Sequence, residues 1–554
     1  MNPLSSKNRP ALIDSLRQQT FDLIVIGGGI TGAGVALDAA SRGLSVALVE
    51  KDDFGAGTSS KSTKLIHGGL RYLKQFEIKL VKEVGRERAI VHRLAPHLVV
   101  PEKMLLPLVK GGTYGPLATR AGLWVYDVLA GVTGTDKRQM LNREETLKKE
   151  PLLSPEGLLG GGYYAEYRTD DARLTIENIK TATDYGASCI NYMQAKDFIY
   201  NDEGKVSGLI CRDRLGEQEI RIKSHHVISA AGPWVDTLRK KDKSLSGKHL
   251  FLSKGVHIVV PHEKLPLQQS IYFDNDDGRM IFAIPRNRAT YIGTTDTPYE
   301  GDLNKIPINL EDVQYLLRAT NQMFPDINLE VEDVESSWAG LRPLIHEEGK
   351  SASEMSRKDE IFESDSGLVS IAGGKLTGYR KMAERVVDVI VDKLTETKKL
   401  KKNHTRKIPL AEGKLKNQKE VEAYKQQLHQ RLGSYGLDKN DTDYLTANYG
   451  TQSEQILDHL SVQDSNHPEQ QLILAELEYT MEHEMVNTAL DFFNRRSGRL
   501  YFNLPSIMPN LDAVLNRMGE KLAWDEERVR QEEKSVKEAI SWVSKFTVKE
   551  KATS

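Results

Sequence analysis

Residues 22–51 carry the pattern that most constrains this chain: a short apolar run, a cluster of glycines and an alanine-rich segment. The run at 23–26 is apolar and partly β-branched, which is typical of a buried parallel strand. The glycines that follow stand in G-x-G-x-x-G spacing, at Gly27, Gly29 and Gly32. Residues 33–42 read as a helix, and a second strand at 45–49 ends in Glu50, about twenty residues after the first glycine. The pattern predicts a strand–turn–helix–strand unit.

Each residue of this unit has a physical role if the unit binds a dinucleotide. Gly27 permits a tight turn, Gly29 lets the backbone approach a pyrophosphate, and Gly32 lets the helix pack closely on the strand. The unpaired amides and the positive dipole end of the helix then hold the phosphates. Glu50 is expected to bind ribose hydroxyls, and an acid at this position argues against a 2′-phosphate. The spacing alone does not distinguish NAD from FAD.

Length and composition bound the class of protein. A chain of 554 residues is too long for one compact core, so two or three domains are expected. A net charge of −2 gives no sign of nucleic-acid binding, and the sequence holds no apolar run of about eighteen residues that could span a membrane. The N-terminal segment lacks the apolar core of a signal peptide. Cys189 and Cys211 lie far apart and outside any C-x-x-C pair, so we expect a cytoplasmic protein with two inert thiols.

The basic, polar stretch at 398–410 is the clearest boundary along the chain. Before it, strand-like and helical runs alternate, which indicates an α/β architecture. Beyond it the chain reads as helical, and one apolar helix face is expected to pack against the rest of the domain. The residues of that face are Val529, Val536, Ile540 and Val543.

Residues 269–297 read differently, as strands joined by turns, which predicts an antiparallel sheet in a second layer. The acidic stretch at 274–278 has a glycine at its end, as some calcium-binding loops have. Counting back from Gly278 puts Phe273 where the first calcium ligand should stand, and strands rather than helices flank it. We interpret this stretch as a hairpin turn.

Three further segments have a composition that suits contact with a cofactor. Residues 54–74 are rich in Gly, Ser and Thr, and residues 226–238 form a strand that ends in small residues. In residues 367–390 a strand meets Gly373, Gly374 and a helix, which gives a second helix N-terminus. An NAD enzyme keeps its binding unit in one piece. A bulky, two-ended cofactor threaded through the domain explains the three segments better, so we predict FAD.

The motifs GTSSKSTKLIHGGLRYL, SWAGLRPL and GGKLTGYRKMAE, together with the N-terminal glycine fingerprint, resemble the FAD-dependent (aerobic, respiratory) glycerol-3-phosphate dehydrogenases. These enzymes belong to the flavoproteins of the glutathione-reductase and D-amino-acid-oxidase type. The resemblance covers nearly the whole chain, and SSKSTKLIHGGLRYL is its most specific part. It implies an α/β fold (α+β overall) with a Rossmann-like FAD-binding domain, an antiparallel-sheet substrate domain and a helical C-terminal domain.

The expected domain boundaries follow from this reading. The FAD-binding domain is expected to be discontinuous, at 1–95, 161–240 and 337–397. The substrate-binding or capping domain takes 96–160 and 241–336, and the helical C-terminal domain takes 398–554.

A phosphorylated polyol needs cations for its phosphate, and arginine matches phosphate geometry with paired donors. By the resemblance, the residues expected to bind substrate are Arg71, Tyr72, Arg342, Arg357 and Lys375. The cofactor is expected to contact Gly27, Gly29, Gly32, Glu50, Thr58, Ser59, Ser60, Lys64, Leu65, His67, Ala231, Gly232, Gly374, Lys375, Leu376 and Thr377. The chain carries Gly378 where relatives commonly have Thr or Ser, which leaves Thr377 as the hydroxyl expected at the flavin. No metal is expected.

The base that takes the hydroxyl proton stays open between His257 and His67, because histidine suits this role near neutral pH. We favour His257, which lies in the expected substrate sheet, and place His67 against the flavin. Arg342 could also act, by stabilising the developing alkoxide.

The expected reaction is oxidation of sn-glycerol 3-phosphate to dihydroxyacetone phosphate by hydride transfer to non-covalent FAD. The resemblance further implies a quinone as electron acceptor and peripheral association with the inner face of the cell membrane. The alternatives are an oxidase that uses oxygen, an amino-acid or amine oxidase of the same superfold, and a flavin-binding module without turnover. The cluster of cations argues against the last two. The sequence does not decide the acceptor, the membrane-facing surface or the oligomeric state, for which a homodimer is one option.

Overall fold

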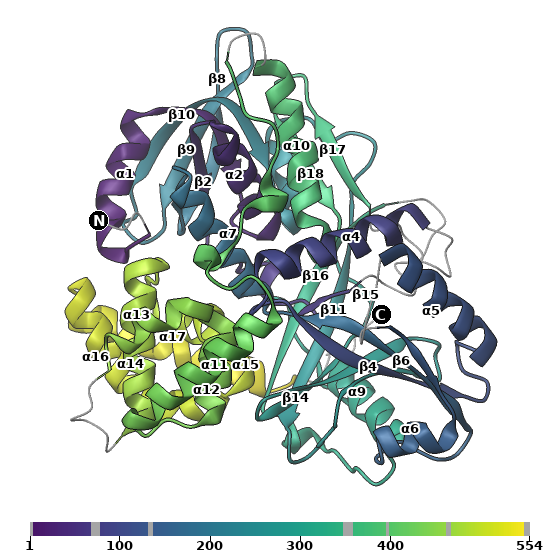
Figure 1. Cartoon of the computed structure of the whole chain (residues 1–554). Coiled ribbons are helices and arrows are strands. Elements are labelled where there is room, and N and C mark those ends of the chain that lie inside the picture. Colours follow the sequence, from purple (N-terminus) through teal and green to yellow (C-terminus); the bar gives the residue numbers. More distant parts are fainter. Residues whose placement is uncertain are drawn as a thin grey trace, which may run out of the picture.

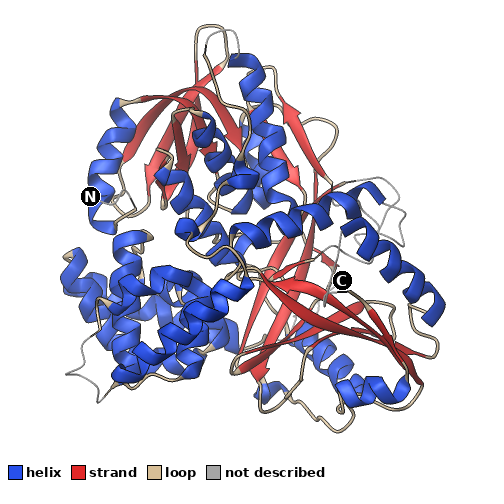
Figure 2. Cartoon of the chain, viewed as in Figure 1, coloured by secondary structure: helices blue, strands red, loops and turns tan. Residues whose placement is uncertain are grey.

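The computed structural model of the chain describes residues 4–67, 78–130, 137–346, 358–394, 398–460 and 467–547. It contains two β-sheets, each flanked by helices, and a cluster of helices near the C-terminus (Figure 1). Figure 2 shows that strands fill the upper part and the lower right part of the molecule, whereas the lower left part is helical. This architecture confirms the predicted fold class.

The first sheet has the strand order β17-β18-β10-β1-β2-β7, extended by β9 and β8. Its strands are β1 (Thr20–Ile26), β2 (Val46–Val49), β7 (Ser188–Ile190), β8 (Met193–Tyr200), β9 (Val206–Asp213), β10 (Glu219–Ser229), β17 (Asp359–Glu363) and β18 (Val369–Gly373). β1 is parallel to β2 and β10, so that Ile26 pairs with Val49 on one side and Ser229 on the other. The carboxyl ends of these strands therefore meet at one edge, where open α/β sheets bind ligands.

Helices α2 (Ile30–Arg42), α7 (Asp171–Asp184) and α10 (Tyr379–Leu394) pack around the first sheet. The predicted helix after the glycines is confirmed, although it begins at Ile30, three residues earlier than the sequence pattern suggested. It ends at Gly43, which adopts a left-handed conformation and satisfies the last carbonyls. Nearly all residues of α2 are buried, because α7 and α10 cover the sides that the sheet leaves free.

The second sheet has the order β15-β11-β14-β13-β12-β4-β6-β3, with β16 paired to β11 and β5 to β6. Its strands are β3 (Leu65–Ile66), β4 (Val100–Val109), β5 (Gln139–Leu141), β6 (Leu158–Arg168), β11 (Leu250–Pro261), β12 (Ser270–Asp274), β13 (Met280–Arg286), β14 (Ala289–Gly293), β15 (Thr297–Pro298) and β16 (Ser336–Ile345). All pairs are antiparallel except β12 with β4. The predicted antiparallel strands are confirmed, and residues 275–278 form the hairpin turn between β12 and β13.

The described part of the chain before residue 398 contains six more α-helices. They are α1 (Arg9–Gln18), α4 (Ile78–Leu94), α5 (Pro116–Ala130), α6 (Arg143–Lys149), α8 (Val235–Lys241) and α9 (Leu310–Met323). Among the described residues, no helix is both long and apolar enough to cross a membrane.

The C-terminal part is helical. Its helices are α11 (Gln418–Leu432), α12 (Lys439–Tyr449), α13 (Ser453–Leu457), α14 (Pro468–His483), a π-helical turn (Asp491–Arg496), α15 (Arg499–Phe502), α16 (Ile507–Leu522) and α17 (Glu526–Ser544). Val536 and Val543 of α17 are buried, and Val529 and Ile540 pack against the same apolar cluster, which confirms the predicted face. That cluster also contains Trp338 of the second sheet, so this sheet and the helical part share one core.

A buried charge network joins the helical part to the first sheet. Arg496 and Arg495 both contact the carboxylate of Asp53, at 2.7 Å and 2.5 Å. Asp53 lies in the loop that follows β2. Arg173 of α7 pairs with Glu484 at 2.6 Å. Burial alone raises the pKa of Asp53, but the two arginines lower it below its usual value. Because each of these charges is buried, removal of one partner would leave the other uncompensated.

The sheets also bear on the expected domain boundaries. β6 and β16, which those boundaries divide between two domains, belong wholly to the second sheet. The boundary stretch at 398–410 is not a free linker, because Ile408 and Leu410 are buried in the core around the first sheet. The three-part division itself stays a prediction.

Candidate active site

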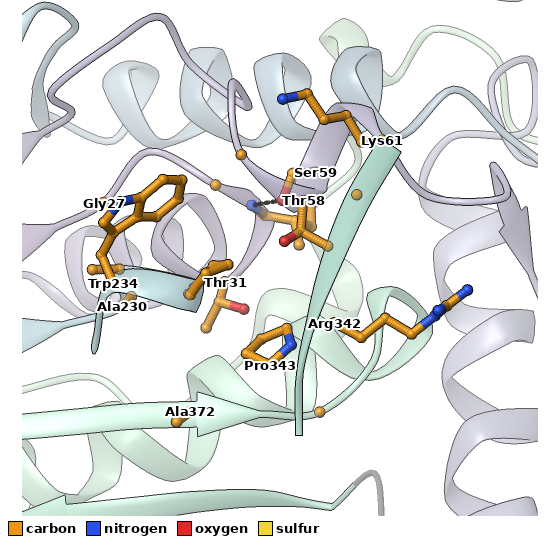
Figure 3. A pocket seen from close by; sticks show the side chains of 18 of the residues that line it. Gly27, Thr31, Thr58, Ser59, Lys61, Ala230, Trp234, Arg342, Pro343 and Ala372 are labelled. Carbon is orange, nitrogen blue, oxygen red and sulfur yellow. Dashed lines mark hydrogen bonds between the residues drawn. The ribbon is translucent and has the colours of Figure 1, made fainter. Parts of the chain in front are cut away.

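A cavity of about 440 Å³ lies where the two sheets meet, and it is lined by the ends of β1, β2, β10 and β18 and by β11 and β16. Figure 3 shows part of its wall: Gly27 and Ala230 follow strands of the first sheet, Thr31 belongs to α2, and Arg342 and Pro343 come from β16. A volume of this size falls in the range of cofactor pockets, about 300–1,000 Å³.

The three fingerprint glycines differ in what an added Cβ would meet. Gly27 has φ +110°, and a Cβ there would stand 2.7 Å from the carbonyl oxygen of Ala230. At Gly32 a Cβ would overlap the carbonyl oxygen of Gly27. At Gly29, by contrast, the nearest atom is the hydroxyl of Ser59, at 3.1 Å. Gly27 and Gly32 are therefore required by the protein backbone itself, and Gly29 is the position whose open side faces the cavity.

The N-terminus of α2 and the carboxylate of Glu50 both line this end of the cavity. Ser59 accepts a hydrogen bond from the amide of Ile30 at 2.9 Å, which covers one of the unpaired amides of the helix. The carboxylate of Glu50 accepts from the amides of Gly28 and Asp52, at 2.6 Å and 2.9 Å. Burial raises the pKa of Glu50 to about 7, although these two amides oppose the shift.

The segment after the fingerprint divides into residues that face the cavity and residues that support them. Thr58 and Ser59 line the cavity, and the Thr58 hydroxyl donates to the carbonyl of Leu341 in β16 at 2.7 Å. Lys64 is not part of the wall, and its ammonium donates to the carboxylate of Asp171 at 2.5 Å and to the carbonyl of Ser60 at 3.2 Å. Burial lowers the pKa of Lys64, but the carboxylates of α7 outweigh it and the net shift is upward.

The second glycine segment forms the opposite wall. Gly373 and Gly374 have φ +79° and +80°, a conformation that side chains rarely adopt. They lead into a 3-10 turn (Leu376–Gly378) and then into α10, so the predicted second helix N-terminus is confirmed, with a short turn inserted. The Thr377 hydroxyl donates to the carbonyl of His67 at 3.4 Å.

His257 stands on β11 and is buried, with its ring stacked on Trp338 at 4.8 Å between centroids. Its Nε2 lies 3.0 Å from the hydroxyl of Thr63. Burial lowers the pKa of His257 well below its usual value, and the nearby charges of Arg342 and Lys64 lower it further. The ring is therefore neutral at pH 7.

Arg342 on β16 pairs in register with Ser253 of β11, four residues before His257, and Arg342 and His257 both line the cavity. Its guanidinium donates to the hydroxyl of Thr294 at 2.9 Å and to the carbonyl of Thr295 at 3.1 Å. A Cβ at Gly255 would overlap this guanidinium, so the glycine makes room for it. The cation is held in position by several partners.

The structure brings most of the predicted site residues to one cavity. Those that line it are Gly27, Gly29, Glu50, Thr58, Ser59, Leu65, His67, Ala231, Gly232, His257, Arg342, Gly374, Lys375, Leu376 and Thr377. Three predicted cofactor contacts, Gly32, Ser60 and Lys64, are not in the cavity wall but lie behind it. Arg71, Tyr72 and Arg357 lie outside the described residues.

Other residues of the wall were not predicted. Lys61 and Trp234 lie within the segments 54–74 and 226–238, which were expected to contact the cofactor, so the sequence indicated the segments but not these two residues. Gln194 and Asn304 come from a strand and a loop with no local motif, and only the tertiary fold brings them to the site. Within the described residues, no group of three or more His, Cys, Asp or Glu side chains is placed to hold a metal ion.

The residues of the cavity wall fit an FAD molecule. Gly29 leaves an open side on the cavity, Glu50 presents a carboxylate at one end, and a second glycine turn opens at the other. The fold and the cavity thus define a protein that holds an extended dinucleotide between two sheets.

Comparisons with known proteins specify the class further. A model of the family "FAD dependent oxidoreductase" matches residues 22–380, and one of the "C-terminal domain of alpha-glycerophosphate oxidase" matches residues 403–529. The chain is 50% identical over 528 residues to the aerobic glycerol-3-phosphate dehydrogenase of Bacillus subtilis, covering 94% of this chain and 95% of that protein. It is 47% identical over 544 residues to the enzyme of the same name from Staphylococcus haemolyticus, covering 97% of each.

A solved structure agrees. The glycerol-3-phosphate dehydrogenase from Bacillus halodurans, complexed with FAD, superposes with a TM-score of 0.83 at 44% identity, covering 98% of this chain and 99% of that one. The L-alpha-glycerophosphate oxidase of Mycoplasma pneumoniae, at 20% identity and a TM-score of 0.55, shares the fold. The chain belongs to the FAD-dependent oxidoreductases and, within them, to the family of aerobic glycerol-3-phosphate dehydrogenases, which confirms the predicted resemblance.

Proposed function

We propose that the protein oxidises sn-glycerol 3-phosphate to dihydroxyacetone phosphate, with FAD bound non-covalently and a quinone as electron acceptor. The observation that carries this proposal is the joint placement of Arg342, Lys375 and His257 in one cavity with the FAD-binding glycines. The relatives that share about half of the sequence are glycerol-3-phosphate dehydrogenases, which supports the same substrate.

The FAD supplies the hydride acceptor when it is bound, and the chain supplies the groups that bind and orient the substrate. Arg342 and Lys375 attract the substrate phosphate, and their charges are already present in the wall before the substrate arrives. His257, which the low pKa keeps neutral, takes the proton of the hydroxyl that is oxidised. Because the charge of Arg342 lowers the pKa of His257, a bound phosphate dianion would offset part of that charge and make the ring a stronger base.

The test is anaerobic reduction of the bound flavin. We expect glycerol 3-phosphate to bleach the yellow holoenzyme, and glycine or D-alanine to leave it unchanged. Reoxidation by a ubiquinone or menaquinone analogue, with slow reoxidation by oxygen, supports the quinone acceptor. Rapid oxygen consumption without a quinone would make the protein an oxidase, and bleaching by amino acids alone would overturn the substrate.

The non-covalent attachment has its own test. Neither cysteine lies in the cavity wall; both are buried, and burial raises the pKa of each thiol to about 12. His67 lines the cavity, and its imidazole is a group that could carry a flavin bond. Acid precipitation should release the colour to the supernatant. A coloured pellet would show a covalent flavin.

We further propose that the protein docks on a membrane surface through α5. Leu117 and Trp124 of this helix are 84% and 56% exposed, and Ala118 and Ala121 are exposed beside them. The opposite side of α5 is occupied, because Thr119 and Leu123 pack on β6. An exposed apolar stripe with a tryptophan suits the interface of a bilayer.

The charge next to this stripe favours a lipid partner over a second copy of the chain. Arg120 is exposed on α5, and a cation beside apolar residues is attracted to anionic headgroups. Vesicles containing anionic lipid should bind the wild type and release it when Leu117 and Trp124 are both replaced by Glu. If the double variant instead changes a dimer into a monomer and leaves vesicle binding intact, the stripe is a homodimer interface.

A further inference from the structure

Lys61 lines the same cavity, yet its ammonium group has no hydrogen bond or ion pair within the described parts of the chain. The other lysines of this region differ. Lys51 donates to Asn304 at 2.5 Å and lies over the ring of Trp234, and Lys64 pairs with Asp171. A partly buried cation that faces a cavity without a partner is costly unless the ligand of that cavity compensates it.

The backbone fixes the position of Lys61. It ends the 3-10 turn Thr58–Ser60, and its amide donates to the carbonyl of Thr58 at 3.1 Å. β16 passes directly behind it, so close that a Cβ on Gly340 would stand 2.5 Å from its carbonyl oxygen. The side chain therefore starts from a turn that packs against β16, and it lines the cavity.

The direction of the side chain separates Lys61 from the substrate cations. In Figure 3 the amino end of Lys61 points up and to the left, above Ser59, whereas the guanidinium of Arg342 points to the right. Ser59 is the residue that contacts the amide of Ile30 at the start of α2. Lys61 thus belongs to the end of the cavity where a helix N-terminus favours an anion.

The surrounding charges agree with this placement. Burial lowers the pKa of Lys61 to about 8, and the cations Arg495 and Lys51 contribute to the lowering. Asp52 is the acid that opposes it. A lysine and a helix N-terminus at the same end of the cavity both favour a ligand with negative charge.

We propose that Lys61 binds the diphosphate of the cofactor and supplies its side-chain counter-charge, next to the backbone amides of the glycine loop. The proposal rests on FAD as the cofactor and not on the substrate. It makes Lys61 a determinant of FAD retention, and it accounts for a lysine of the wall whose ammonium has no other partner among the described residues.

The experiment measures the rate of FAD release from holoenzyme, by the recovery of flavin fluorescence after dilution. Lys61→Met should release FAD about tenfold faster or more, because a charge-assisted contact to phosphate is lost. Lys61→Arg keeps the charge and should stay close to the wild type. Lys241→Met is the matched control: Lys241 also lines the cavity, but its ammonium donates to the carbonyl of Lys196 at 2.8 Å, and release should stay within about twofold of the wild type.

The pH dependence of FAD release from the wild type provides a second measurement. With the diphosphate bound, the pKa of Lys61 should rise above its value of about 8, and the contact is lost when pH exceeds that raised value. FAD release from the wild type should therefore accelerate in alkaline solution. Lys51 also has a pKa lowered by burial, so the step is assigned to Lys61 only if Lys61→Arg removes it.

The outcomes are distinct. If Lys61→Met retains FAD as the wild type does, or if Lys61→Arg releases it as fast as Lys61→Met, the charge of Lys61 does not hold the cofactor and the proposal is overturned. With FAD in excess, Lys61→Met should still be bleached by glycerol 3-phosphate. If the wild type itself is not bleached, the proposed substrate is wrong while the release measurement still decides the role of Lys61.

Discussion

The two ends of the cavity are built by different means. At the α2 end, the shape of the wall is set by backbone: an added Cβ at Gly27 or Gly32 would collide with main-chain oxygens of the same unit. At the β11–β16 end, the polar groups of the wall include the side chains of His257 and Arg342, which neighbouring side chains and carbonyls hold in place.

This difference predicts different responses to mutation. A backbone collision cannot be relieved by a rotamer change, so substitutions of the glycines at the α2 end should abolish folding or cofactor binding. A side chain at the other end can be removed without moving the backbone, so substitutions there should reduce the rate in graded steps. The following variants test this contrast, in decreasing order of expected effect.

Gly32→Ala should have the largest effect. Its Cβ would overlap the carbonyl oxygen of Gly27, so β1 and α2 could not pack, and we expect at least about 3 kcal/mol of destabilisation and loss of FAD. Thermal or urea unfolding measures it. The control is Gly122→Ala in α5, where nothing lies within 4 Å of the new Cβ and helix propensity should add up to about 1 kcal/mol of stability. A Gly32→Ala protein as stable as the wild type would contradict the steric interpretation.

Gly29→Val should lose FAD but keep its fold. A Cβ there meets only the hydroxyl of Ser59, at 3.1 Å, while the new methyl groups occupy the side that faces the cavity. We expect FAD affinity to fall at least about 100-fold, with a circular dichroism spectrum and an unfolding temperature close to those of FAD-free wild type. A yellow, folded Gly29→Val protein would show that the pyrophosphate lies elsewhere.

Arg342→Ala should retain FAD and lose activity. Removal of a buried phosphate contact costs roughly 2–5 kcal/mol, which corresponds to a fall in kcat/KM of about thirty- to several thousand-fold. Since Arg342 lies beside His257, we expect kcat to fall most, whereas Arg357→Ala, outside the described residues, should mainly raise KM. Arg342→Lys keeps the charge and tests the geometry. Equal losses with glycerol and glycerol 3-phosphate would exclude a phosphate contact.

Glu50→Gln should give the smallest effect, on the retention of FAD and on the pH dependence of protein stability. The carboxylate–ribose hydrogen bonds are worth about 1.5–3 kcal/mol each, more than a neutral amide provides. In the cofactor-free protein burial raises the pKa of Glu50 to about 7, so the folded state binds this proton more tightly than the unfolded state does. The resulting stabilisation of the fold is complete below the ordinary pKa of glutamate and is lost as pH rises through 7.

The measurement for Glu50 is thermal unfolding of FAD-free protein between pH 5 and 8. Each unit of pKa difference contributes about 1.4 kcal/mol, and Glu50→Gln should flatten the decline in stability with rising pH. If both proteins show the same slope, another buried group carries the pH dependence.

Local patterns were sufficient for the elements nearest the fingerprint. The strand, glycine turn, helix and second strand were predicted because each depends on its own residues: β-branched apolar runs, a fixed glycine spacing and an acid at the strand end. The error of three residues in the start of α2 arose because Ile30 and Thr31 are already helical, with Gly29 as the N-cap. The hairpins of the second sheet were found for the same reason, since turn residues separate their strands.

The site was predicted less completely. Lys64 was placed at the cofactor because it stands in the most specific motif, yet its ammonium reaches Asp171, which is more than one hundred residues away in the chain. Gln194 and Asn304 enter the wall from β8 and from the loop before α9, where no local pattern indicates a ligand. A motif shows which segment approaches a cofactor, but not which of its side chains turn toward it.

By itself the sequence determined the dinucleotide unit, the choice of FAD over NAD and the family, because glycine spacing and motif segments are local properties of the chain. Only the tertiary structure decided which lysines of this segment face the cavity: within the described residues the ammonium of Lys61 has no hydrogen bond or ion pair, while Lys64 is paired with Asp171. It also decided that the helical part is held to the first sheet by the charges around Asp53. The physical reason is that burial and pairing of a charge depend on contacts between segments far apart in sequence, which no local pattern encodes.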